Sequence, residues 1–66
     1  MSIPPEIEAA ITARVAAMGH KERYDRAAAM IDIPEPRDED EVEFAKLILG
    51  PQASTKELAA MLQLND

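Results

Sequence analysis

The chain has 66 residues, no cysteine and a formal net charge of −6 at pH 7. A domain of this length leaves much of its surface in water, and without cysteine no disulfide or thiolate-metal site can supplement its core. The acidic balance opposes general attraction to nucleic acid or to an anionic membrane surface, because both depend on basic patches. Small domains without such staples pack their helices tightly or self-associate, so we expect a homo-oligomer.

The first two expected helices are separated by a glycine. An apolar stripe with the spacing of one helical face runs through Ile7, Ile11, Val15 and Met18. Ser2 is placed to cap the start of this helix. After Met18 the apolar stripe changes sides of the helical wheel, so we predict a break at Gly19-His20, with Gly19 as a left-handed C-terminal cap. A second helix should run over about residues 21–31, antiparallel to the first.

The third expected helix follows a proline-rich linker at residues 32–36, since two prolines two apart forbid a continuous helix. Asp38 should be its N-cap, with Glu41 three residues later in a capping box. The apolar residues of this helix cover roughly 220° of the wheel, whereas a helix covered by one neighbour needs about 100°. We therefore expect the helix to be central to the fold or shared with a partner, and to stop at Gly50.

The fourth expected helix opens with the capping box Ser54-Thr55-Lys56-Glu57 and carries Leu58, Met61 and Leu62 on its apolar face. Leu64 should fold back beneath it. The chain as a whole predicts an all-α fold in a single domain over residues 1–66. Its parts are a helical hairpin, a proline linker, a central apolar helix and a short capped C-terminal helix.

Enzyme chemistry has no support in the residue inventory. His20 is the single histidine and lies beside a helix break, far in sequence from the serine and threonine hydroxyls. The acidic block lacks the EF-hand pattern, because a calcium loop starting at Asp38 would need glycine where Glu43 stands and glutamate where Leu49 stands. We expect a non-enzymatic protein with no cofactor and no metal. The start of the chain lacks a signal-peptide pattern and no long apolar run is present, so we expect it in the cytoplasm and not in a membrane.

One stretch favours nucleic-acid binding. Residues Ser54 to Asn65 resemble the first helix and turn of a helix-turn-helix motif, with a polar cap, Glu-Leu-Ala and an apolar pair before a short turn. Gln63 stands where that motif usually has its turn glycine, and the chain ends where a recognition helix would begin. A DNA-binding module is therefore the alternative function. A further alternative, suggested by the acidic charge of the chain and not by this stretch, is an inhibitor that mimics nucleic acid.

The preferred function is a protein-binding regulator, inhibitor or adaptor. Acids are concentrated between Asp32 and Glu43, more of them than helix capping requires, and the block runs directly into the most apolar stretch of the chain. The partner should offer a basic surface, or an apolar surface with basic residues around it. Aromatic residues often anchor interfaces. The candidate partner-binding residues are Asp38, Glu39, Asp40, Glu41, Glu43, Phe44, Leu47, Ile48 and Tyr24.

Overall fold

The computed structural model describes residues 3–63 and confirms the all-α fold. Its helices are α1 (Pro5–Ala16), α2 (His20–Met30), α3 (Asp38–Leu49) and α4 (Thr55–Gln63). The described residues contain no strand, and none of their helices is long and apolar enough to cross a membrane. The predicted N-cap Ser2 and Leu64, which was expected to fold back beneath the fourth helix, lie outside the described residues.

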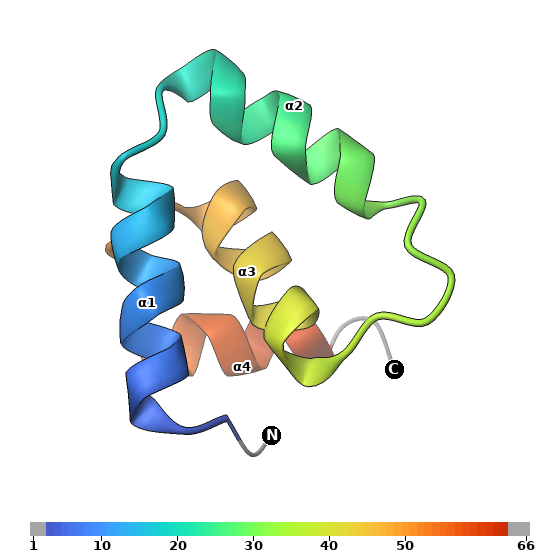
Figure 1. The fold of residues 1–66 in the computed structure, drawn as a ribbon. Coiled ribbons are helices and arrows are strands. Elements are labelled where there is room, and N and C mark those ends of the chain that lie inside the picture. Colours follow the sequence, from blue (N-terminus) through green and yellow to red (C-terminus); the bar gives the residue numbers. More distant parts are fainter. Residues whose placement is uncertain (1–2, 64–66) are drawn as a thin grey trace.

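Helix α3 holds the fold together. The helices α1, α2 and α4 each pack against α3, and Figure 1 shows α3 lying between them. The hairpin expected for the first two helices is open, because α2 leads away from the end of α1 and both helices pack on α3 rather than along each other. The prediction that the third helix is central is confirmed.

The helix boundaries follow from local backbone chemistry, with two corrections. Gly19 does not form the left-handed C-terminal cap of α1: its φ is −75°, and it is the N-cap of α2, with its N–H 3.4 Å from the Glu22 carboxylate. Likewise Arg37, not Asp38, is the N-cap of α3, and its backbone N–H donates to the Asp40 carboxylate at 3.1 Å. In both places the capping acid lies three residues after a cap that has no acceptor of its own, so the side chain reaches back to the backbone N–H of the cap.

The last two boundaries are as predicted. Gly50 ends α3 with φ at 109° and ψ at 158°, a backbone conformation that is open essentially only to glycine. Ser54 precedes α4, and its hydroxyl accepts a hydrogen bond from the Glu57 N–H at 3.2 Å.

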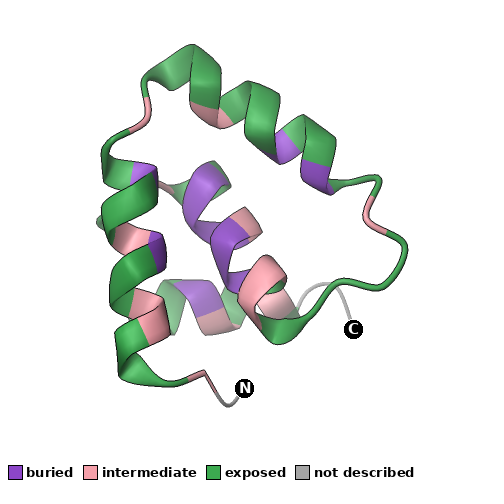
Figure 2. Cartoon of the chain, viewed as in Figure 1, coloured by how far each residue is buried: buried purple, intermediate pink, exposed green. Residues whose placement is uncertain are grey.

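The apolar core lies along the side of α3 that faces α1 and α2 (Figure 2). Its buried cluster consists of Ile11, Val15, Ala27, Met30, Val42 and Leu47. Leu58 of α4 is also buried. The predicted stripe of the first helix is thus confirmed at Ile11 and Val15, while Ile7 and Met18 are partly buried against the cluster.

Two charged residues of α3 are buried along with its apolar residues, while part of its apolar surface is exposed. Glu43 and Lys46 are each only 3% exposed, whereas Ile48 and Leu49, at the end of the same helix, are 47% and 43% exposed. The physical reason lies in the neighbouring helices, because arginines on α1 and α2 provide the opposite charge for Glu43. An apolar part of α3 is left facing solvent as a result.

Candidate partner-binding groove

A groove of about 660 Å³ lies over the outer side of α3, between α4 and the linker that follows α2. We call it the outer groove. Its lining residues are Met30, Ile31, Ile33, Pro36, Asp38, Asp40, Glu41, Phe44, Ala59, Leu62 and Gln63. Its size falls within the range of ordinary ligand sites, roughly 300–1,000 Å³.

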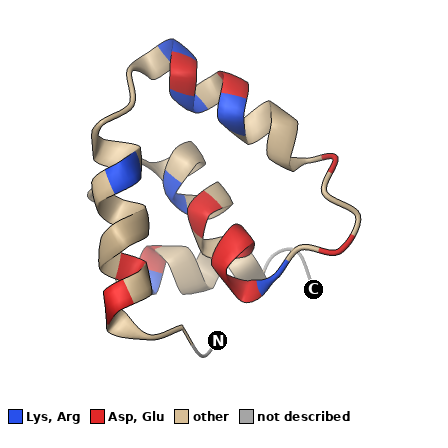
Figure 3. Ribbon diagram, viewed as in Figure 1, with Lys and Arg blue, Asp and Glu red and all other residues tan. Residues whose placement is uncertain are grey.

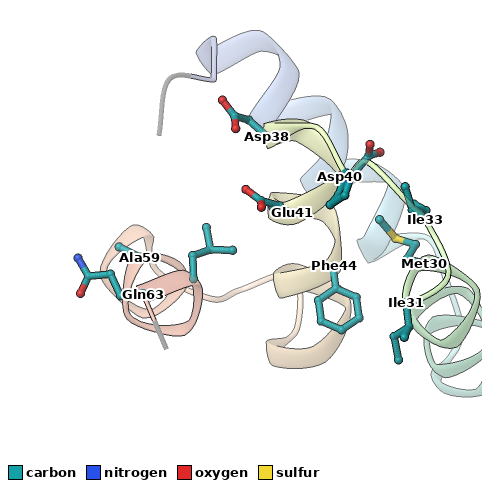
Figure 4. A pocket seen from close by; sticks show the side chains of 11 residues that line it. Met30, Ile31, Ile33, Asp38, Asp40, Glu41, Phe44, Ala59 and Gln63 are labelled. Atoms are coloured by element: carbon teal, nitrogen blue, oxygen red, sulfur yellow. The ribbon is translucent and has the colours of Figure 1, made fainter. Parts of the chain in front are cut away.

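The middle of the outer groove is apolar. Phe44 projects from α3 toward Met30 and Ile31 in Figure 4, and Leu62 lines the groove from α4. Phe44 and Leu62 are partly buried and pack against the edge of the core cluster, so one side of each is held in place. A partner side chain entering here would meet a preformed apolar surface.

One end of the outer groove is acidic. Asp38, Asp40 and Glu41 all come from the first turn of α3, and Figure 3 shows this turn as the most continuous acidic band of that helix. Asp40 is partly neutralised by Arg37, whose Nε lies 3.5 Å from its carboxylate. Within the part of the chain that the structure describes, Asp38 and Glu41 make no ion pair. Their charges are available to an incoming cation.

Glu43 does not line the outer groove but forms ion pairs with two neighbouring helices. Its carboxylate pairs with Arg14 of α1, and its second oxygen lies 3.2 Å from Nη2 of Arg26 on α2. The carboxylate is nearly fully buried, while the two arginine side chains are 56% and 49% exposed. Each arginine therefore keeps much of its side chain in water, and the carboxylate ties α1 and α2 to α3.

The structure separates the nine predicted partner-binding residues into three groups. The outer groove brings together Asp38, Asp40, Glu41 and Phe44. Glu43 and Leu47 are buried among the helices, which corrects the expectation that Glu43 lies outside the core. Glu39, Ile48 and Tyr24 lie outside the groove lining.

Tyr24 and Ile48 are nonetheless accessible. Tyr24 is 66% exposed on α2 and makes an edge-to-face contact with His20, with 5.5 Å between ring centroids. Ile48 lies one helical turn beyond Phe44 on α3. Glu39 is close to Arg37, with 3.8 Å between the Glu39 carboxylate and Nη2 of Arg37.

The groove-lining residues of α2, the linker and α4 were not predicted from the sequence. Ile31, at the expected end of the second helix, is 71% exposed and lines the groove. Leu62 was predicted to lie on the apolar face of the fourth helix. It packs against the core cluster and also lines the groove. The proximity of Ile31 and Ile33 to the acidic block was a usable signal, because the linker is too short to carry these residues far from α3.

Among residues 3–63, no group of histidine and carboxylate side chains is arranged to hold a metal ion. Comparison of the chain with protein-family models, with curated proteins and with solved structures gives no match. The outer groove is therefore the candidate functional site of the described residues.

Proposed function

We propose that this protein is a non-enzymatic regulator or adaptor that binds another protein through the outer groove. The partner offers an apolar surface with basic residues beside it. The observation that supports this most directly is the joining of Phe44 to Asp38 and Glu41 in one groove, where an apolar surface and unpaired negative charge lie side by side. Apolar contact supplies affinity in such a site, and charge supplies selectivity and speed of association.

The arrangement of α3 also supports the proposal. A central helix in a small domain would normally direct its large apolar residues inward, because apolar burial is the main favourable term in folding. Here α3 directs Glu43 inward and leaves Ile48 exposed, with Phe44 only partly covered. A partner that covers Phe44 and Ile48 would remove this apolar surface from water.

The test is a pair of charge-reversal variants with the same change in net charge. Asp38→Lys/Glu41→Lys alters the groove, and Glu6→Lys/Glu8→Lys alters the first turn of α1, which does not line it. Both variants place lysines at a helix N-terminus, so both lose a similar stabilisation of about 0.3–1 kcal/mol per group. We expect affinity capture followed by mass spectrometry to lose its enriched proteins with the groove variant and to retain them with the α1 variant.

Equal capture by both variants would contradict the proposal. The alternative of DNA binding is tested on the same proteins by titrating duplex DNA at ~50 mM and ~200 mM salt, because proteins that neutralise phosphates lose orders of magnitude in affinity over that range. Duplex binding by the wild type that weakens steeply with salt, and that Asp38→Lys/Glu41→Lys tightens, would replace protein binding as the function.

A further inference from the structure

Side chains of three different kinds follow one another along the outer side of α3. Glu41, Phe44 and Ile48 follow one another at i, i+3 and i+7, so their side chains leave the helix within about 60° of one another. Negative charge lies at the N-terminal end of this line, an aromatic ring in the middle and an exposed aliphatic side chain at the far end. Ile48 does not line the outer groove but lies one helical turn beyond Phe44 along α3.

The length of the line limits the occupant. The ten residue steps from Asp38 to Ile48 correspond to about 15 Å along the helix axis at 1.5 Å per residue. A partner helix lying along α3 would need about three turns to meet both ends. Interdigitating helices prefer crossing angles of roughly −50° or +20°, and the shallower of these keeps a partner helix alongside α3 over this length.

The groove offers side chains rather than a sheet edge. Among residues 3–63 there is no strand, so an extended partner would find no ladder of backbone N–H and C=O groups to pair with. A helix satisfies these groups internally and presents only side chains. The outer groove therefore favours a helix over an extended peptide.

We infer that the occupant is an amphipathic α-helix of about three turns, with lysine or arginine clustered at the end that lies over Asp38 and Glu41. Its apolar stripe covers Phe44, Leu62 and Ile48. This inference rests on the proposed function and specifies the partner of the same groove. Charge complementarity fixes which end of the partner lies where, and the apolar contacts hold it in the groove.

A synthetic peptide of about 14 residues tests the inference. Its apolar residues, one of them tryptophan, are placed at i, i+3, i+4 and i+7, with about three lysines grouped at one end. The protein contains no tryptophan, so the emission of the peptide reports binding without background. Three control peptides keep its length: one replaces the lysines by glutamate, one places proline in the middle of the polar face, and one scrambles the order.

We expect saturable binding of the parent peptide, with amide shifts in the protein at Phe44 and Leu62. Each control peptide should bind at least about tenfold more weakly, because it loses the charge match, the helix or the apolar stripe. Asp38→Lys/Glu41→Lys should weaken the parent peptide by about tenfold, whereas Glu6→Lys/Glu8→Lys should leave its affinity unchanged.

Absence of parent binding would overturn the inference, as would a proline or glutamate peptide that binds as tightly as the parent. These results are distinct from failure of the proposed function. If natural proteins are captured through the groove while the helical peptide is not bound, only the helical partner is wrong. If capture does not depend on the groove, the proposed function itself is wrong.

Discussion

On α3 the charged residue Glu43 is more deeply buried than its aromatic neighbour Phe44, the reverse of what their side-chain chemistry suggests. The carboxylate of Glu43 is buried and the ring of Phe44 is partly in solvent. A one-residue step along a helix turns the side chain by about 100°, so neighbours in sequence can face opposite environments. Their roles therefore differ, and so do the expected effects of changing them.

Phe44→Ala should leave the protein folded and weaken partner binding. Truncating a fully buried phenylalanine costs about 3–5 kcal/mol of unfolding free energy, but Phe44 is only partly buried, so we expect a loss of about 1–2 kcal/mol. The control is Leu58→Ala, which removes a smaller side chain that is 3% exposed and should cost about 2–5 kcal/mol. Urea denaturation of both variants checks the order, and a larger loss for Phe44→Ala would show that the ring belongs to the core.

Glu43→Gln should destabilise the fold because it leaves Arg14 and Arg26 close together without a counter-charge. Removing one partner of a fully buried ion pair costs about 3–5 kcal/mol, and since both arginines are about half in water we expect about 2–3 kcal/mol. Glu39→Gln is the matched control: this side chain is 41% exposed and its change should stay within about 0.5 kcal/mol. Equal urea midpoints for the two variants would mean that the buried carboxylate contributes nothing to the stability of the fold.

The positions of the helices along the chain could be predicted from the residues that start and stop helices. Prolines, glycines and the Ser54 capping box act through a residue's own backbone or through residues a few positions away, so a single sequence contains their causes. The two capping errors have different origins. Gly19 was predicted to be a C-terminal cap because glycine commonly ends helices, and Asp38 to be an N-cap because its side chain can accept a hydrogen bond. In both places the acid at the third helical position instead accepts a hydrogen bond from the backbone N–H of the N-cap.

The orientation of α3 could not be predicted in the same way. Periodicity shows which residues share a face, but with roughly 220° of apolar arc it does not show which part of that arc is covered. The deciding interaction joins Glu43 to arginines on two other helices, and helical periodicity contains no information about such distant pairs. For the same reason the acidic and aromatic parts of the groove were predicted, while its walls from α2 and α4 were not.

Gly50→Ala should destabilise the end of α3. Alanine is strained at a φ of 109°, and the added Cβ would lie 3.6 Å from Nη2 of Arg23, which donates a hydrogen bond to the Leu47 carbonyl at 2.9 Å. We expect a loss of about 1–3 kcal/mol in unfolding free energy. Gly19→Ala is the control, because φ there is −75° and nothing lies within 4 Å of the new Cβ. A thermal denaturation series in which both alanines behave alike would contradict this account of the helix end.

The molecule as a whole leaves several large apolar side chains exposed. These are Tyr24, Ile31, Ile48 and Leu49, and the buried apolar cluster of the described residues is small. We expect self-association at micromolar concentration, because pairing would bury surface that a core of this size cannot cover. Sedimentation equilibrium should give a mass above that of one chain, with a thermal midpoint that rises with concentration. A single-chain mass and a midpoint independent of concentration would contradict it.

The order of the helices has a consequence for how the chain acquires its structure during synthesis. Because α1 and α2 both pack on α3, and α3 follows them in the chain, neither helix has its main packing partner when it leaves the ribosome. Arg14 and Arg26 likewise lack the counter-charge of Glu43 until α3 has emerged. Short helices are marginal in water without tertiary contacts. We therefore expect the nascent chain to remain open until α3 emerges, with α4, which follows α3 in the chain, packing last.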